Sequence, residues 1–417
     1  MSLETLHKSR GGRFKRNDKK DVAAIFEAQV RVIQRIWEIA MKQKSLGQEV
    51  DVSNKRKGRC GRKPMDDILS FVPTVSLNQR STVRSLAMAL GINKSTLYKK
   101  FKMGKLRRHS NTLKPTLADK NKRDMLDFCV SMLDETTLGD AGPSFTSMQN
   151  IVHIDEKWFY MTKNKRNYYL LPEEEDPKRT VQNKNCIGKV MFLAAVARPR
   201  YDEDGNVTFT GKIGIWPFVK MVAAAKKSKN RERGTLETKS VLVTRDVMRE
   251  YITQKVVPAI QEMWPAGDGQ PIWIQQDNAR THILADDPAF LEAVQVTGLD
   301  IRIMNQPANS LDMNVLDLGF FRSIQSLIDC RVPKTLKDLI EGVHKEFVGY
   351  DVTKLNRVFI TLQTCMIEVL NNGGRNGYKP PHLYKERLER LGLFPSRIPV
   401  PPAVYAKALE MLGLGVH

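Results

Sequence analysis

The sequence predicts an α/β core preceded by all-α domains, and three observations lead to this prediction. The 417 residues carry a net charge of +21, and residues 1–110 hold 26 Lys and Arg against 9 Asp and Glu. This first quarter therefore carries +17 and the remaining 307 residues only +4. Apolar residues in the basic quarter recur at helical spacing, whereas strand-like runs alternate with amphipathic helices between residues 151 and 330. At about 150 residues per domain, the length suits two or three domains.

Composition excludes several classes of protein. The longest apolar run, Val190 to Ala197, is far shorter than the roughly 18 residues that a membrane span needs. The N-terminal residues lack the apolar segment of a secretory signal. Five cysteines are scattered without CxxC spacing, which argues against a disulfide framework and against a zinc finger. We therefore expect an intracellular protein with reduced thiols and no membrane partner.

Residues 1–50 are predicted to form a first, weakly marked helix-turn-helix. Helical spacing runs from Asp21 to Lys44, with a turn near Val30 and an apolar stripe that begins at Ile33. Glu27 stands where the turn glycine of such a motif is expected. A helix-turn-helix and an ordinary helical hairpin therefore both remain open.

Residues 51–64 form a predicted basic linker. The run KRKGRCGRKP ends in Gly61 to Pro64, an extended and slim segment that suits an A·T-rich minor groove. Arg59, Arg62 and Lys63 are its candidate DNA-binding residues. Such a run also serves as a nuclear localisation signal, so we expect the nucleus as the compartment.

Residues 65–107 are predicted to form a second helix-turn-helix. One helix follows from the apolar spacing that starts at Val83, Gly91 supplies a left-handed turn, and Asn93 is expected to cap a second helix over 94–102. Leu97 would dock that helix, which leaves its polar face for the major groove. The candidate DNA-binding residues on that face are Lys94, Ser95, Lys99 and Lys102. An ordinary helical hairpin is the alternative.

The core follows a polar linker or dimerisation segment at 108–150. Its element order is three strands, helix, strand, helix, strand, helix, which is typical of ribonuclease-H-like nucleotidyl transferases. We predict a mixed five-stranded sheet with helices over 151–330 and a helical C-terminal extension over 331–417. The strands are expected at 151–155, 167–171, 189–197, 271–277 and 300–306, and the helices at 246–264, 287–296 and 312–328.

Three aspartates lie at the edges of these core elements. Asp155 ends the first strand, Asp277 ends the fourth, and Asp317 lies in the first turns of the last helix. In this topology the first and fourth strands are neighbours, so Asp155 and Asp277 should meet beneath Asp317. Each alone could be a turn or cap residue, but clustered carboxylates repel one another and divalent cations relieve that repulsion. Oxygen ligands suit two Mg2+ ions, with Mn2+ as a substitute, in phosphodiester chemistry.

Several motifs then resemble one family. They are HIDEKWF from His153, GKIGIWPFVK from Gly211, GTLETKSV from Gly234, QQDNARTH from Gln275 and PANSLDMNVLDLGFF from Pro307. Together they resemble transposases of the mariner superfamily, most closely the plant-type branch, over residues 20–395. The 39 residues between Asp277 and Asp317 agree with the spacing of that branch.

The resemblance implies that Asp155, Asp277 and Asp317 are the metal-binding catalytic triad of a cut-and-paste DNA transposase. It implies binding to terminal inverted repeats, metal-dependent hydrolysis at both ends of the element and strand transfer into TA target sites. It also implies a homodimer that pairs two ends. A catalytically decayed or host-recruited DNA-binding protein is the alternative, and a nuclease without end specificity is a weaker one.

Neighbouring residues have less specific roles. Asp312 would give a 34-residue spacing, but the motif favours Asp317, and Asp312 is expected to cap the helix. Glu156 should point to the opposite strand face from Asp155 and be structural. His282 and Asn278 are expected to support the site by hydrogen bonds, and His153 to be a core residue. The family usually has proline where this chain has Leu311.

Overall fold

The chain divides into two compact units, Met1–Asn111 and Thr112–His417. The computed structural model describes residues 17–53, 67–108, 115–137, 142–162, 174–175, 187–227, 232–266 and 269–414. No helix in these ranges is long and apolar enough to cross a bilayer. The predicted strand at 167–171 and the linker residues Arg59, Arg62 and Lys63 lie outside the described residues.

The first helix pair has a small core and an unusual turn. Helices α2 (Asp18–Ile25) and α3 (Val30–Ser45) pack through Val22, Ala23 and Ile33. Glu27, between them, has φ of +49°, a left-handed conformation that costs a residue with a Cβ about 1–2 kcal/mol. The sharp turn is therefore built without glycine.

The second helix pair follows its prediction closely. Thr82 and Ser85 cap the first helix reciprocally, and Gly91 has φ of +65° at the turn. Leu86, Ala87 and the fully buried Leu97 form the core. Asn93 precedes the second helix, but its side chain makes no capping hydrogen bond. The elements are η1 (Asp67–Thr74), η2 (Leu77–Arg80), α4 (Val83–Ala89) and α5 (Lys94–Lys102).

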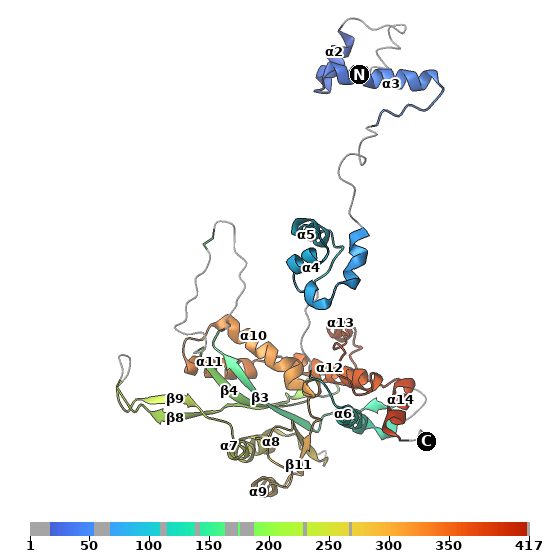
Figure 1. Ribbon diagram of the computed structural model, residues 1–417. Coiled ribbons are helices and arrows are strands. Elements are labelled where there is room, and N and C mark those ends of the chain that lie inside the picture. Colours follow the sequence, from blue (N-terminus) through green and yellow to red (C-terminus); the bar gives the residue numbers. More distant parts are fainter. Residues whose placement is uncertain are drawn as a thin grey trace. The chain divides into compact units, whose positions relative to one another are not determined.

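A mixed five-stranded sheet forms the centre of the second unit (Figure 1). Its strand order is β11-β10-β3-β4-β7, in which β10 runs parallel to both β11 and β3 while β4 runs antiparallel to β3 and β7. The predicted neighbours, the first and fourth core strands, are thus confirmed as the adjacent pair β3 and β10. The strands are β3 (Ile151–Tyr160), β4 (Lys189–Ala197), β7 (Lys212–Pro217), β10 (Ile272–Gln276) and β11 (Ile301–Asn305).

Alternation along β3 creates a core on each face of the sheet. Ile151 and Phe159 enter one core, whereas Val152 and Ile154 enter the other. The second core is covered by the predicted helix at 246–264, which includes a π-helical turn, and by α9 (Figure 1). These elements are α7 (Arg245–Tyr251), η5 (Ile252–Val256), α8 (Val257–Met263) and α9 (Pro288–Thr297).

The first core is larger and draws on both ends of the second unit. Met125 and Cys129, from the predicted linker segment, are buried together with residues after position 331, such as Phe359 and Leu412. The predicted divisions at 150 and 330 therefore do not separate hydrophobic cores. The helices on this face are α6 (Asp119–Ser131), α10 (Phe321–Arg331), α11 (Leu336–Val348), α12 (Val352–Asn371) and α14 (Pro402–Leu412).

Two local features differ from the sequence-based expectation. The edge strand β7 was not predicted as a strand. The helix expected over 312–328 is instead a 3-10 turn, a π-helical turn and α10, and Asp312 lies inside the first turn instead of capping a helix. The remaining elements are β1 (Leu133–Asp134), η3 (Glu135–Thr137), β2 (Ser144–Phe145), β5 (Arg200–Tyr201), β6 (Val207–Phe209), η6 (Leu311–Met313), η7 (Leu316–Phe320) and α13 (Lys385–Arg390).

Candidate active site

Asp155 lies on the central strand and faces the helical layer that contains η7. It is opposite Ala194 of β4, and its Oδ1 accepts a hydrogen bond from the backbone N–H of Glu156 at 2.7 Å. Burial, together with the charges of Asp317, Glu156 and Asp277, raises the pKa of Asp155 to about 8, although the hydrogen bond from the Glu156 N–H opposes this change. The four carboxylates therefore share one electrostatic environment, and Asp155 holds a proton at neutral pH.

Asp317 reaches Asp155 from the π-helical turn η7. The charge of Asp317 raises the pKa of Asp155, so the two carboxyl groups lie within electrostatic reach of each other. Burial raises the pKa of Asp317, while Lys157, whose Nζ lies 3.8 Å from Asp317 Oδ1, opposes that change. The predicted encounter of these two acids is present in the structure.

Asn314 fixes the turn that carries Asp317 to the strand that carries Asp155. Its Nδ2 donates to the carbonyl of Ile154 at 3.1 Å, and its Oδ1 accepts from the N–H of Leu316 at 3.0 Å. Asn314 is buried, so both bonds are shielded from water. Sequence reasoning missed this residue, although an asparagine immediately before a helical turn is a recognised capping signal.

Asp277 follows β10 and is held in a different environment. Its Oδ1 accepts from the N–H of Ala279 at 2.8 Å, and the Nδ1 of His282 lies 2.9 Å from the same oxygen. The hydrogen bond from His282 lowers the pKa of Asp277. This acid, which is about half-exposed, is therefore ionised at neutral pH while Asp155 is not.

His282 joins Asp277 to Glu156. Its Nε2 lies 2.9 Å from Glu156 Oε1, and its side chain is only 3% exposed. Burial lowers the pKa of His282, but hydrogen bonds to Asp277 and Glu156 outweigh burial and raise it to about 10. Both ring nitrogens therefore donate at neutral pH. Glu156 lies on the opposite strand face from Asp155, as expected, yet it is connected to the site through this imidazolium.

A layer of amides supports the loops that carry the acids. Gln275 Nε2 donates to Gln306 Oε1 at 3.0 Å and to the carbonyl of Met313 at 2.8 Å. Asn278 donates to the carbonyl of Gln306 at 2.8 Å. The predicted supporting role of Asn278 thus takes the form of a bond to the backbone after β11. His153 is buried against Phe359 as a core residue, and burial lowers its pKa to about 3.

The donor set fits a hard divalent cation, although the side chains do not form a finished metal site. Among the described residues, no group of three or more His, Cys, Asp or Glu side chains is arranged to hold a metal ion. Asp155 has a raised pKa, and Asp277 is turned towards His282. Protonation of one group is how two adjacent carboxylates relieve repulsion without a cation. The oxygen-only set suits Mg2+ or Mn2+ better than zinc.

The predicted DNA-binding residues on α5 are accessible. Lys94, Ser95, Lys99 and Lys102 are all exposed on α5, whose opposite face carries the buried Leu97. Lys102 Nζ lies 5.7 Å from the ring centroid of Tyr98. The second helix of the pair therefore presents a basic face, as a groove-binding helix requires.

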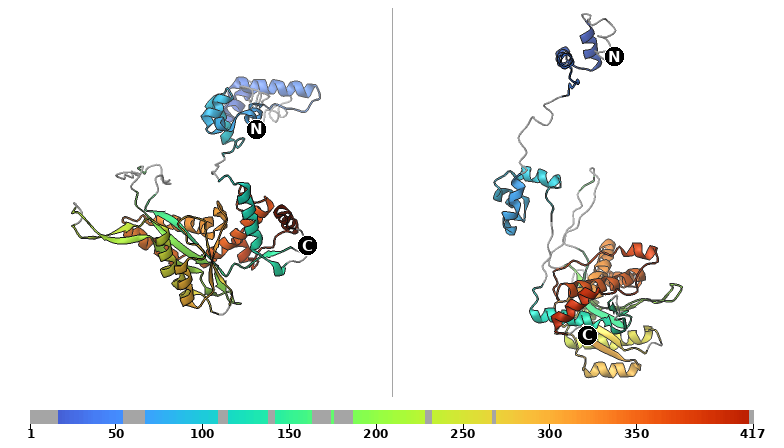
Figure 2. Two further views of the ribbon diagram at one scale, coloured as in Figure 1. Left: turned by 60° about the horizontal axis from the view of Figure 1, so that its bottom comes forward. Right: turned by 90° about the vertical axis from the view of Figure 1, so that its right-hand side faces the viewer.

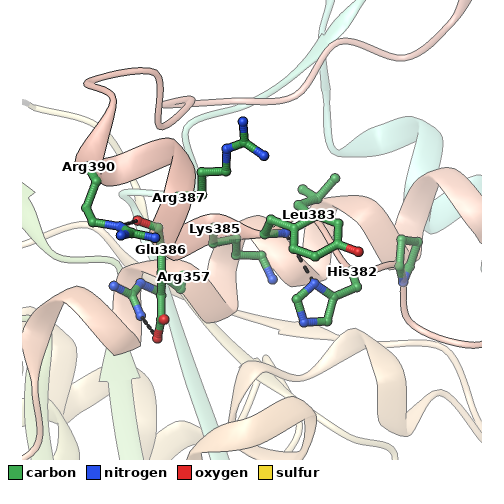
Figure 3. A pocket seen from close by; sticks show the side chains of 9 residues that line it. Arg357, His382, Leu383, Lys385, Glu386, Arg387 and Arg390 are labelled. Carbon is green, nitrogen blue, oxygen red and sulfur yellow. Dashed lines mark hydrogen bonds and ion pairs between the residues drawn. The ribbon is translucent and has the colours of Figure 1, made fainter. Parts of the chain in front are cut away.

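A separate cavity of about 420 Å3 opens beside α13, and its lining includes none of the three predicted acids (Figure 3). Arg357 contacts both acids of α13, with Nε 2.9 Å from each carboxylate oxygen of Glu389 and Nη1 2.9 Å from Glu386 Oε1. Because these carboxylates are already paired with Arg357, the cavity does not compete as a metal site.

Comparisons with known proteins agree with this architecture. Residues 4–47 match the model of a family described as a domain of unknown function (DUF7769). The sequence has no match among curated proteins that would indicate a relative. A solved pre-cleavage Mos1 transpososome is similar in structure, with a TM-score of 0.56 and 14% identity over 90% of this chain and 92% of that chain.

Two further Mos1 structures give the same result. The Mos1 mariner paired-end complex with Mn has a TM-score of 0.57, with 14% identity over 90% of this chain and 93% of that chain. The Mos1 strand transfer complex has a TM-score of 0.56, with 14% identity over 90% of this chain and 92% of that chain. The chain therefore has the fold of a mariner-type transposase, and the predicted fold class, a ribonuclease-H-like core with helical domains before it, is confirmed.

Proposed function

We propose that this protein is a cut-and-paste DNA transposase of the plant-type mariner-like branch. The observation that carries the proposal is the placement of three acids on neighbouring elements, with Asp155 on β3, Asp317 on η7 where its charge raises the pKa of Asp155, and Asp277 at the end of the adjacent strand β10. Structures of similar fold include transposase complexes before cleavage, with paired ends and after strand transfer. Geometry and fold thus support the same chemistry.

Asp155, Asp277 and Asp317 would hold the metal. Neighbouring structures contain Mg or Mn, which supports two Mg2+ ions with Mn2+ as a substitute. When bound, such ions would supply activation of a water or a 3′-hydroxyl and stabilisation of the leaving oxygen. Asp155 must release its proton before it can act as a ligand, whereas His282 already keeps Asp277 ionised. His282 and Asn314 orient the acids on either side.

The rest of the chain supplies the DNA ends. We propose that the exposed face of α5 and the basic linker bind terminal inverted repeats, and that the freed ends join TA target sites. A homodimer would pair two ends, in line with the paired-end assemblies of the structural neighbours. The basic run from Lys55 to Pro64 would also direct the protein to the nucleus.

Cleavage by variants of the three acids tests this function. DNA flanking the coding region of this protein, labelled at one end, is incubated with protein and Mg2+, and the 3′ ends are mapped on a denaturing gel. Asp277→Ala and Asp317→Ala should abolish discrete cuts and leave DNA binding intact. Asp312→Asn is the matched control, because Asp312 lies five residues before Asp317 and its carboxyl group interacts with Tyr378, so that only its charge acts on Asp317. Undiminished cleavage by Asp277→Ala would refute the proposal.

A non-catalytic DNA-binding protein is the second candidate function. It is favoured by the lack of a ready three-ligand group among the described side chains and by the exposed Leu311 in the turn before Asp317. This candidate predicts sequence-specific binding with no cleavage in either Mg2+ or Mn2+. Metal-dependent cuts that EDTA prevents would exclude it.

A further inference from the structure

A two-stranded ribbon extends from the edge of the catalytic sheet. It consists of β8 (Val219–Ala223) and β9 (Leu236–Ser240), which pair with each other and with no other described strand. Figures 1 and 2 show it projecting beyond the helices of the second unit. Its base is fixed by the buried Phe218, whose N–H donates to Met191 at 2.8 Å and whose carbonyl accepts from Val241 at 2.9 Å. The ribbon is therefore a continuation of β7.

The register gives the ribbon two different faces. Lys220 lies directly opposite Lys239, next to the cross-strand pair Val222 and Glu237. The other face carries uncharged residues, among which Met221 is 59% exposed and Leu236 64% exposed. We call the face with Lys220 and Lys239 the lysine face.

The lysine face is unfavourable without an anion. Like charges directly opposite each other on paired strands are destabilising. Glu237 offsets part of this repulsion, because its Oε2 lies 3.9 Å from Lys239 Nζ. Such a partly exposed ion pair contributes little stabilisation. Residues 219–227 and 232–240 together hold five basic and two acidic side chains. A hairpin of two strands is itself marginally stable in water, so this segment gains from a bound polyanion.

We infer that the lysine face binds phosphates of the duplex DNA that the catalytic unit holds, an inference that rests on the proposed function. A two-stranded ribbon fits the width of a major groove, and lysine ammonium groups bind phosphates as point charges. Because such contacts go to the backbone, they are independent of sequence. The ribbon thus anchors DNA beside the site of cleavage.

The sheet register places this contact relative to the acids. Asp155 lies opposite Ala194, which lies opposite Ile215, and Lys220 is five residues further along. Five residues span about 17 Å along the strands and two strand spacings about 10 Å across them. The lysine face is therefore roughly 20 Å from Asp155, which corresponds to about six base pairs at 3.4 Å each.

The salt dependence of DNA binding tests the inference. Affinity of the full chain for a fluorescent 50-base-pair random duplex is measured over a range of salt concentrations. Because each lost phosphate contact changes the slope of log K against log salt by about 0.9, K220Q/K239Q should be shallower by about 1.8. K220R/K239R should keep the wild-type slope, and M221S/L236S, on the other face, should keep it too. Thermal unfolding of each variant checks that the fold is retained.

A matched control separates a local contact from net charge. K337Q/K345Q removes two exposed lysines from α11 and should leave the slope unchanged. The inference would be overturned if K220Q/K239Q had the same slope as wild type. It would also be overturned if K337Q/K345Q changed the slope as much as K220Q/K239Q does. A shallower slope in M221S/L236S with an unchanged slope in K220Q/K239Q would place the DNA on the uncharged face of the ribbon and would likewise overturn the inference.

The length of the DNA provides a second test that requires cleavage. On an end that the protein cuts, duplex is removed from each side in turn. The binding difference between wild type and K220Q/K239Q should vanish when fewer than about six base pairs remain on one side. If no DNA is cut, the proposed function fails while the random-duplex measurement still decides the role of the ribbon.

Discussion

The two sides of the candidate active site hold their acids in opposite states. On one side Asp155 and Asp317 are each partly buried, and the pKa of each is raised. On the other side Asp277 is about half-exposed, and the protonated His282 lowers its pKa. The side of Asp277 therefore carries an internal cation, the protonated His282. The side of Asp155 and Asp317 has only the partly exposed Lys157.

If the proposed function holds, this difference indicates where a bound cation would act. Glu156 and Asp277 share the charge of His282, so their side is close to balanced. Asp155 and Asp317 are balanced by a proton and by Lys157 at 3.8 Å. A divalent cation should therefore displace the proton of that pair and draw Asp277 in from the other side.

Removal of the internal cation should have the largest effect. His282→Gln leaves Glu156 and Asp277 without a charged partner, and a supporting residue of this kind typically changes metal affinity or activity 10–100-fold. We expect a loss of that size in Mn2+ affinity, measured by electron paramagnetic resonance, and in cleavage. His344→Gln, a half-buried histidine beside Phe192, is the control. Wild-type Mn2+ affinity in His282→Gln would contradict a positioning role.

The buried pair should make stability depend on pH in a defined direction. The pKa of Asp155 rises from 3.8 to about 8 on folding, so the folded state binds the extra proton between those values. The stabilisation that the Asp155 proton contributes is fully present below pH 3.8 and is lost as the pH rises through 8. Wild type should therefore lose more stability than Asp155→Asn between pH 5 and pH 9, as measured by urea unfolding without divalent ions.

The titration of His282 cannot explain a difference between wild type and Asp155→Asn, because His282 is present in both proteins. Its stabilisation is likewise present below pH 6.5 and lost as pH rises towards 10. Mg2+ at pH 9 should restore stability to wild type more than to the variant. Parallel pH profiles for the two proteins would show that Asp155 is not protonated in the folded state.

The smallest effect is expected for the exposed lysine on the buried side. Lys157→Gln removes the charge that opposes the raised pKa of Asp317, and such a partly exposed pair is worth at most about 1 kcal/mol. The variant should bind Mn2+ up to about fivefold more tightly, because a competing positive charge is gone. Weaker Mn2+ binding would mean that Lys157 supports the acids instead of competing with a cation.

Pattern-based reasoning predicted most of the core elements. The continuous apolar run of β4 and the helical spacing before Gly91 were sufficient, because burial on one or both faces leaves a direct trace in the sequence. The neighbouring positions of β3 and β10 followed from topology alone. Asp155 was expected to end a strand over 151–155, but β3 continues to Tyr160 and Asp155 lies in its middle. The fold was therefore predictable, whereas the roles of the three acids stay predictions.

The remaining features depend on contacts that no local pattern records. Asn314 is defined by a bond to Ile154, 160 residues earlier in the chain, and His282 by a bond to Glu156, 126 residues away. The edge strand β7 has short alternation interrupted by Gly214 and Pro217, which are weak strand formers. The turn at Glu27 adopts a conformation for which its residue type gives no signal.

The parallel pairing of β3 with β10 also bears on biosynthesis. Trp273 pairs with Ile151 across 121 intervening residues, and Asp317 and the covering helix α12 come later still. Since a chain emerges from the ribosome at about 5–20 residues per second, the first acid is made many seconds before its partners. A prematurely terminated chain retains the basic first unit and lacks the assembled acids. If the proposed function holds, such a fragment would occupy DNA ends without cutting them and would compete with the full-length protein.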